Sequence, residues 1–560
     1  MKKIIIVLIF ITLVSNNLFA TTYYVSNSGN DTNSGLSPAD SWLTMDNINW
    51  PVTFLAGDSI LFKRGDTWNE DLTFRSTGVS GSHVVFGAYG EGSKPIIDVP
   101  GKNEAISCGG SFVTIQDFIL KNAAVNGLSI VKTGGSYSIN VFRVEIINSG
   151  SNGLAVVKGG SDIIIDSVRV INTGNNAIYF NGTALNKLNN VTVQNCYVSG
   201  VERNDGIVVH EDGEHNTAGS NYIFRNNYSE LCAEQGFDIT TASNVLLDNN
   251  ITQNNEEGGV VVGWSADNVT IQRHTSINDA PYTAAAIILG ATNIKLIYSQ
   301  IIGNGHHLLW VKKNKKNVED NIEIYNNVFA TDGGGSMVDI TEELDNLVVK
   351  NNIFTTLRGS MPRVMRFMSS SRPPSHSTFE FDNNIYYSPD GVVQFYFLAN
   401  NTNYSLSQYQ SVFKQDLNSF SANPEFVNLD RVGPDFHLTS ISPAIDKGID
   451  VGLTSDFDNL SVPYNSIPDI GAFEYSVPTS VMENSAFLDV LFYPNPVNNF
   501  LFIKSGMKIK DTRVVNIHGQ NMNVEIVNSS INTAFLKNGL YFLKLESEKG
   551  IFTTKFIVQH

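Results

Sequence analysis

Ionisable side chains gather in one part of the chain, between residues 200 and 265. Two carboxyl groups that flank a glycosidic bond can cleave it, one as acid and the other as base or nucleophile. A histidine base beside an arginine can instead remove the proton next to a uronate carboxylate whose charge the arginine neutralises. Both reactions break polysaccharide chains, and the catalytic candidates that this stretch supplies are His210, Asp238, Arg203 and Glu211.

The same stretch offers side chains that could hold a metal ion or a substrate. Carboxylates are hard oxygen ligands of the kind that Ca²⁺ prefers, and the candidates for this role are Asp205, Glu234 and Glu257. Candidates for contact with a sugar are Trp264, Thr240 and Tyr179. In the alternative interpretation, these charges lie on a solvated surface and balance one another.

Alternating runs that begin with Gly or Ala supply the strands that would position these side chains. They span 127–131, 153–157, 177–181, 206–210, 236–240, 259–263 and 286–290. The second residue of each run is apolar and is expected to point inward, so the third, which is Asp238 in its run, points outward. Strands lie about 4.8 Å apart and rise about 3.3 Å per residue, so the Cβ atoms of His210 and Asp238 should lie roughly 8 Å apart.

A second pattern, an apolar run that ends in a polar pair, recurs every 23 to 32 residues between Phe112 and Asn384. Clear copies are 221–227, 244–250, 321–327 and 346–352. Such a period, with period-two strands and no helical pattern, predicts an all-β fold, a right-handed parallel β-helix. A leucine-rich repeat would need a leucine scaffold that is absent here. The final Asn of each copy should stack inside a turn, and His274 and Cys196 in this column should be buried turn residues.

The length, net charge and apolar segments of the whole chain limit the classes of protein to which it can belong. It has 560 residues and a formal net charge of −17, which argues against binding to nucleic acid. Residues 1–20 carry the basic, apolar and small-residue parts of a signal peptide, and no later run is long enough to span a bilayer. The sequence therefore predicts a soluble, exported monomer. His306–His307 is a weak metal motif, and Lys312–Lys316 is interpreted as a solvated loop.

Several motifs resemble known modules. Residues 22–66 resemble the opening of secreted β-helix proteins of the pectate-lyase-like superfamily, a likeness that extends to about residue 400 and implies a β-helix over 21–415. Residues 422–428, 435–438, 442–446 and 468–474 resemble the module called choice-of-anchor Q, which implies a cap over 416–478 on the last coils. In this module Asp446, Asp469 and Glu474 would be structural. The polygalacturonase motifs are absent as a set, so no catalytic residue is carried over.

The end of the chain resembles the C-terminal sorting domain of the type nine secretion system. Four motifs in order carry this resemblance, at 492–497, 515–519, 538–542 and 553–558. It implies a small β-sandwich over 485–560 that engages the secretion machinery. It also implies release from the cell or attachment at its surface.

Two reactions and one non-catalytic role remain open. The sequence favours a lyase that cleaves a uronate polysaccharide by β-elimination, with Arg203 and His210 as acting groups. A glycoside hydrolase would instead pair Asp238 with Glu211 or Asp205. A non-catalytic glycan-binding or adhesive β-helix is the third hypothesis, and it predicts broad aromatic exposure rather than one charged cluster.

Overall fold

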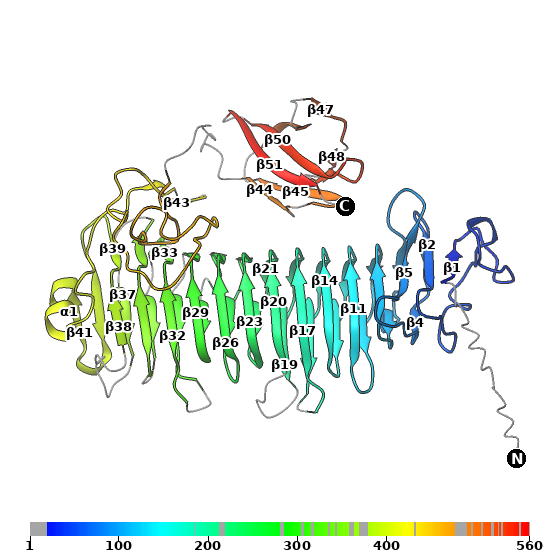
Figure 1. The fold of residues 1–560 in the computed structure, drawn as a ribbon, viewed down its shortest axis with the longest axis horizontal. Helices are drawn as coiled ribbons and strands as arrows, with labels where there is room; N and C mark the ends of the chain where they lie inside the picture. The colour runs from blue at the N-terminus through cyan, green and yellow to red at the C-terminus, as the bar shows by residue number, and fades with distance from the viewer. Residues whose placement is uncertain are drawn as a thin grey trace, which may run out of the picture.

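Three long parallel sheets, A, B and C, wind into a β-helix whose coils stack along the long axis of the molecule in Figure 1. The computed structural model describes residues 20–183, 185–211, 219–280, 285–303, 307–314, 318–333, 336–341, 344–357, 363–368, 379–430, 433–476, 490–493, 495, 497–505, 508–516, 520–524, 526–527, 530–547 and 550–558. The predicted signal peptide lies outside these residues, apart from Ala20. Within the described part of the chain, no helix combines the length and apolar character that crossing a bilayer requires.

Each coil contributes one strand to each sheet in turn. Sheet A contains β1 (Thr22–Val25), β2 (Ser59–Lys63), β5 (Val84–Tyr89), β8 (Val113–Gln116), β11 (Ser136–Phe142), β14 (Gly160–Asp166), β17 (Leu188–Gln194), β20 (Gly219–Arg225), β23 (Ala242–Asp248), β26 (Asp267–Gln272), β29 (Thr292–Ile297), β32 (Ile322–Tyr325), β35 (Leu347–Lys350) and β38 (Phe379–Asp382). Sheet B contains β3 (Thr67–Trp68), β6 (Ile96–Asp98), β9 (Ile119–Lys121), β12 (Glu145–Ser149), β15 (Arg169–Thr173), β18 (Tyr197–Val201), β21 (Tyr228–Cys232), β24 (Ile251–Gln253), β27 (Thr275–Ile277), β30 (Gln300–Gly303), β33 (Val328–Thr331), β36 (Ile353–Thr356) and β39 (Ile385–Tyr387).

Sheet C carries the predicted site. It contains β4 (Leu72–Phe74), β7 (Glu104–Cys108), β10 (Asn126–Val131), β13 (Leu154–Val157), β16 (Ile178–Gly182), β19 (Ile207–Glu211), β22 (Gln235–Ile239), β25 (Gly258–Val262), β28 (Ala285–Leu289), β31 (His307–Val311), β34 (Ser336–Ile340), β37 (Arg363–Phe367), β40 (Gln394–Phe397) and the antiparallel β41 (Thr402–Ser405). The predicted inward column of this sheet is confirmed, because its members are fully buried: Leu128, Leu154, Ile178, Ile207, Phe237, Val260 and Ile287.

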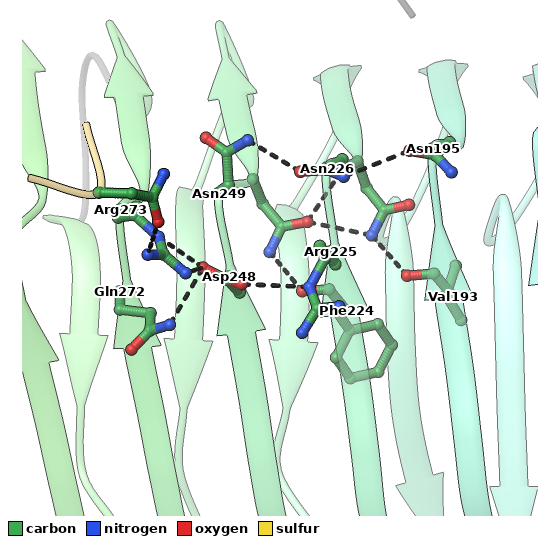
Figure 2. A network of polar contacts seen from close by, with 12 residues as sticks. Val193, Asn195, Phe224, Arg225, Asn226, Asp248, Asn249, Gln272 and Arg273 are labelled. Atoms are coloured by element: carbon green, nitrogen blue, oxygen red, sulfur yellow. Dashed lines mark hydrogen bonds and ion pairs between the residues drawn. The ribbon is translucent and has the colours of Figure 1, made fainter. Parts of the chain in front are cut away.

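The turn between sheets A and B explains the asparagine pattern. Its first residue has a left-handed backbone, as at Asn226 with φ of 55°, a conformation that Asn tolerates well. Its second residue points into the core, where the amide of Asn227 donates to Asn250 Oδ1 at 3.0 Å and to the carbonyl of Val193 at 2.9 Å. Figure 2 shows hydrogen bonds of this turn linking successive coils, including those that end at the carbonyls of Val193 and Phe224. The predicted ladder is therefore confirmed, and His274 and Cys196 are buried in the same column.

A buried carboxylate reinforces this turn on its outer side. Asp248 accepts hydrogen bonds from Arg225 Nε at 3.1 Å, Arg273 Nε at 2.8 Å and Gln272 Nε2 at 3.1 Å (Figure 2). Arg273 also bonds to Asn459, far along the chain, so this network joins the β-helix to the segment that follows it.

We expect Asp248→Asn to lower the free energy of unfolding of the β-helix by about 2–3 kcal/mol, because two arginines lose the charge that they surround. Calorimetric melting at neutral pH measures this change. Glu380→Gln is the control, since Glu380 pairs with Lys350 at a site where its side chain is 62% exposed, and such pairs contribute less than about 1 kcal/mol. Equal melting temperatures for the two variants would contradict the prediction.

The residues that close the end of the solenoid differ from those expected. Helix α1 (Leu406–Phe413) follows β41 and buries Tyr409 against Phe395, with ring centroids 4.4 Å apart. The described residues of the segment predicted as the cap, 416–430 and 433–476, pack on the last coils in two places. The first residues bond to the last coil, where Asn384 Nδ2 donates to Asp416 Oδ1 at 3.0 Å. The later ones lie along the outer face of sheet B, where Phe436 and Ile470 belong to the same apolar core as Ile353.

This flanking segment contains β42 (Phe426–Asn428) and β43 (Asp435–Leu438), and its carboxylates bond to backbone amides. Asp469 accepts from the backbone of Asp446 at 2.7 Å, and Glu474 accepts from the backbone of Asp469 at 2.9 Å. These contacts agree with the structural role expected for Asp469 and Glu474, whereas Asp446 takes part through its backbone. Short 3₁₀ turns complete the solenoid at Pro38–Asp40 and Leu398–Asn400.

The C-terminal residues form a small sandwich of two antiparallel sheets. The strands are β44 (Val490–Tyr493), β45 (Phe500–Ser505), β46 (Ile509–Asn516), β47 (Asn521–Met522), β48 (Ile526–Val527), β49 (Ser530–Asn532), β50 (Gly539–Ser547) and β51 (Gly550–Val558). Tyr493 stacks 5.3 Å from Tyr197 and 5.2 Å from Tyr228, so the sandwich contacts sheet B. Figure 1 shows it beside the coils rather than at their end.

Candidate functional site

One outward column of sheet C holds the polar side chains that could do chemistry. Strand pairing places Tyr179 beside Val208, Val208 beside Asp238, and Asp238 beside Val261. Pairing then continues through Ile288 to the last strands. The register predicted for Asp238 is therefore confirmed, and this carboxyl faces outward among apolar neighbours.

The surroundings of Asp238 favour its protonated form. Its Oδ1 atom is shielded from solvent and has no hydrogen-bond partner among the described residues, although the residue as a whole is partly exposed. Desolvation, followed by the negative charges of Asp205 and Glu234, raises the pKa of Asp238 well above its ordinary value, while a hydrogen bond from Thr240 acts in the opposite direction. A carboxyl in this state can donate a proton near neutral pH.

Asp205 is the second carboxyl of this pair, and a ladder of amides positions it. In the preceding coils Asn176 Nδ2 donates to Asn152 Oδ1 at 3.0 Å, and the backbone N–H of Asp205 continues the series to Asn176 Oδ1 at 3.3 Å. Its own Oδ1 accepts from the backbone of Gln235 at 3.0 Å. Desolvation and the nearby charges of Glu234 and Glu257 raise the pKa of Asp205 to about 7 despite that bond.

Glu234 and Glu257 complete what we call the acidic cluster, with Asp205 and Asp238. Glu234 is partly exposed, and desolvation together with the charge of Glu257 raises its pKa. Glu257 is exposed. The cluster thus combines two carboxyls whose pKa values are raised chiefly by desolvation, Asp205 and Asp238, with two carboxylates that solvent can reach. This arrangement is suitable for acid–base chemistry.

The other predicted catalytic residues lie around this cluster. His210 is exposed and pairs with Asn181, two positions beyond the partner of Asp238, so the two residues are diagonal neighbours as expected. Arg203 is exposed in the turn before β19, and no described carboxylate forms an ion pair with it. Glu211 ends β19, but its side chain lies outside the described residues.

The predicted sugar contacts differ in their exposure. Trp264 follows β25 with 40% of its surface exposed and a left-handed backbone, φ 56°. Tyr179 is half-buried, and its hydroxyl accepts from Asn181 Nδ2 at 2.6 Å. Thr240 is only 5% exposed, and its hydroxyl acts to lower the pKa of Asp238. Thr240 is therefore better placed to orient that carboxyl than to touch a sugar.

Binding of Ca²⁺ by Asp205, Glu234 and Glu257 stays a prediction. Among the described residues, no group of three or more His, Cys, Asp or Glu side chains is placed to hold a metal ion. Asp205 Oδ1 already accepts from the backbone of Gln235 at 3.0 Å. No step below is routed through this ion.

A second cluster on the same face was missed. Asp339 pairs with Trp310 on one side and with Arg366 on the other, in the same column as Asp238. Asp339 accepts from Arg366 Nε at 2.9 Å and lies 3.4 Å from His307 Nε2. These strands also alternate, but Leu308, Met337 and Val364 replace the Gly or Ala that begins the earlier runs. His307 had been weighed only as a metal ligand, and Lys312 only as part of a solvated loop.

Comparisons with known proteins agree with the fold. Residues 104–276 match a family model described as a right handed beta helix region. Residues 491–559 match the secretion system C-terminal sorting domain. No curated protein matches the chain.

Several solved structures are similar to the chain at low identity. The chain is similar to the GH136 lacto-N-biosidase from Eubacterium ramulus, with 16% identity over 65% of this chain and 68% of that one and a TM-score of 0.44. It is also similar to XylC in complex with xylose, with 12% identity over 73% and 87% of the two chains and a TM-score of 0.46. A mannuronic acid specific family 6 lyase from human gut microbiota has 12% identity over 72% and 92% and a TM-score of 0.43.

The sorting domain marks the chain for export or attachment at the cell surface. Its contacts with sheet B leave the outer face of sheet C to the strands and loops of the solenoid itself. The chain is thus a right-handed parallel β-helix protein that ends in a sorting domain of the type nine secretion system.

Proposed function

We propose that this protein is an exported glycoside hydrolase that binds a polysaccharide along the outer face of sheet C. One observation carries the proposal: a desolvated carboxyl, Asp238, faces the substrate side of the sheet with its pKa raised well above the ordinary value beside a second raised carboxyl, Asp205. A protonated carboxyl next to ionised ones is what glycosidic cleavage requires.

Asp238 and Glu234 have different roles in the reaction. Asp238 donates its proton to the oxygen of the leaving sugar as the glycosidic C–O bond breaks. Glu234, which is partly exposed and close enough to raise the pKa of Asp238, is the carboxylate that assists attack on the sugar carbon. Water supplies the oxygen of the new reducing end and a proton that restores the carboxyl. The buried Thr240, whose hydroxyl lowers the pKa of Asp238, is the neighbour that orients this carboxyl.

The lyase that the sequence favoured becomes the second candidate. Its charge-neutralising residue, Arg203, is exposed and has no described carboxylate partner, and the carboxyls that surround Asp238 would repel a uronate. The observation in favour of a lyase lies in the second cluster, where His307 and Arg366 meet with their Nε2 and Nη2 atoms 3.4 Å apart. A histidine base beside an arginine suits β-elimination.

The products of cleavage separate the candidates. We expect incubation with neutral and acidic polysaccharides to release reducing ends whose mass includes one added water, without ultraviolet absorbance. Mass spectrometry and absorbance of the same digest measure both properties. Products with an unsaturated, absorbing end and no added water would overturn hydrolysis in favour of the lyase. Binding without new ends for any glycan would favour the non-catalytic alternative.

A further inference from the structure

Positive charge collects on the outer face of sheet C at its C-terminal end, although the chain has 54 acidic and only 37 basic residues. Lys312 Nζ lies 3.4 Å from the ring centre of Trp310, and Arg363 Cζ lies 4.3 Å from the ring centre of Tyr396. All four side chains are half-buried. We call them, together with Arg366, the cationic cluster.

Contacts within the protein hold this cluster in place. Trp310 Nε1 donates to Thr341 Oγ1 at 3.2 Å, which fixes the ring beneath Lys312. Arg366 donates to Asp339 from Nε and Nη2, while its Nη1 has no hydrogen-bond partner among the described residues. Cations that rest on aromatic rings or carboxylates lose less conformational freedom when a ligand binds.

Strand register connects this cluster to the proposed acid. From Asp238 the outward column runs through Val261 and Ile288 to Trp310, then through Asp339 and Arg366 to Tyr396, as the successive strand pairs show. Five strand steps of about 4.8 Å separate Asp238 from Arg366, on the strand that also carries Arg363, or roughly 24 Å. A sugar chain lying across the strands would therefore touch both places at once.

We propose that the cationic cluster is a binding subsite for the carboxylate of a uronate sugar, several units away from the bond that is cleaved. This inference rests on the proposed function and names its substrate class. Arg363 has no described carboxylate partner, so its planar fork is free to bind a ligand carboxylate through two parallel hydrogen bonds. The neighbouring rings offer apolar faces to the sugar itself.

The placement also separates charge recognition from catalysis. Sequence reasoning had assigned the recognition of a uronate to Arg203, next to the acidic cluster. In the structure the acidic cluster repels an anion, and the cations lie several strands away. An acidic chain would thus be held at one end of the column while a bond further along reaches Asp238.

Binding can be measured without cleavage in the Asp238→Asn protein. Calorimetric titration would use hexasaccharides of galacturonate, glucuronate, mannuronate and guluronate, the methyl ester of each, and a sulfated neutral hexasaccharide. We expect at least one uronate to bind, and the additional change Arg363→Gln to weaken that binding by about 10-fold at low salt. The matching methyl ester should change by less than about 2-fold.

Arg75→Gln is the matched control, because Arg75 also rests on an exposed ring, with Cζ 4.7 Å from the centre of Trp50, at the far end of the solenoid. It should leave uronate binding unchanged, and thermal melting checks that each variant folds. Four outcomes would each overturn the proposal. Arg363→Gln could weaken the binding of uronate and ester equally, or leave uronate binding unchanged. The protein could also bind the sulfated sugar more tightly than any uronate, or bind no uronate at all. A failure to detect hydrolysis would not by itself overturn the proposal, because the titration measures binding and not cleavage.

Discussion

Asp238→Asn is expected to reduce the rate of glycan hydrolysis by about 10²–10⁴-fold, the range that a positioned general acid contributes. The amide has nearly the same shape as the carboxyl but cannot donate a proton of suitable acidity. Because the substrate still meets the same surface, KM should change much less than kcat. Steady-state kinetics on the polysaccharide that the product assay identifies would measure both constants.

Asp162→Asn is a closely matched control for this variant. Asp162 lies on sheet A with a left-handed backbone, and its Oδ1 accepts from Asn190 Nδ2 at 3.0 Å. Asn occupies the same position in later coils, so the change is tolerated there and should leave kcat unaltered. If Asp238→Asn retained more than about a tenth of the wild-type kcat, the assignment of the general acid would be wrong.

The dependence of activity on pH is a further test of Asp238 as the general acid, which a purely structural role of this residue would not pass. Desolvation and the charge of Asp205 raise the pKa of Asp238 well above its ordinary value, so activity should fall on the alkaline side of the profile as that proton is lost. In Asp205→Asn the repulsion from Asp205 disappears and only desolvation and Glu234 remain. The alkaline limb of the profile should therefore move to lower pH, and an unmoved limb would contradict the coupling of the two carboxyls.

The fold could be predicted from the sequence because its repeat is local. The turn that holds Asn227 and Asn250 needs a particular side chain at a particular place in every coil, so each copy marks the register of its own strands. Once that register was set, the outward position of Asp238 followed from alternation along the strand. The burial of Thr240 could not be predicted in this way, because the register tells which face of the sheet a side chain points to but not how far its neighbours cover it.

The second cluster could not be found in the same way. The strands that carry His307, Asp339 and Arg366 have Leu308, Met337 and Val364 at the position where the earlier strands have Gly or Ala, so the run that marked the earlier strands is absent. His307 and Arg366 are 59 residues apart, and only the pairing of β31, β34 and β37 brings them together. Likewise, motifs could identify the 416–476 segment as a module, but not whether it covers the end or the side of the solenoid.

Asp205→Asn is expected to raise the free energy of unfolding at pH 8 by an amount on the order of 2–4 kcal/mol. The pKa of Asp205 is raised from an ordinary value of 3.8 to about 7, chiefly by desolvation. The folded protein therefore binds more protons than the unfolded chain between these values. The stability due to the protonated group is fully present below pH 3.8 and is lost as pH rises through about 7. An amide does not titrate, so it avoids that loss.

The neighbouring coils supply the reason why an amide should fit at this position. Asn126, Asn152 and Asn176 occupy it in the three preceding coils, and Asn176 Nδ2 donates to Asn152 Oδ1 at 3.0 Å. The variant amide can extend that series toward Asn176 and still accept from the backbone of Gln235, as Asp205 Oδ1 does at 3.0 Å. Asp205 thus stands where the ladder would favour Asn. Such a replacement is expected where a functional site is maintained at the expense of stability.

Thermal melting at pH 4 and pH 8 separates this explanation from a general gain in packing. The difference between Asp205→Asn and the wild type should be large at pH 8 and close to zero at pH 4, where Asp205 is protonated in the folded protein. Asp205→Ala also removes the charge but loses the acceptor for Gln235, so its gain at pH 8 should be smaller. An equal gain at both pH values would show that the buried charge is not the cause. A loss at pH 8 would show that the carboxylate stabilises the turn, and Asp205 would then belong to the scaffold rather than to the reacting pair.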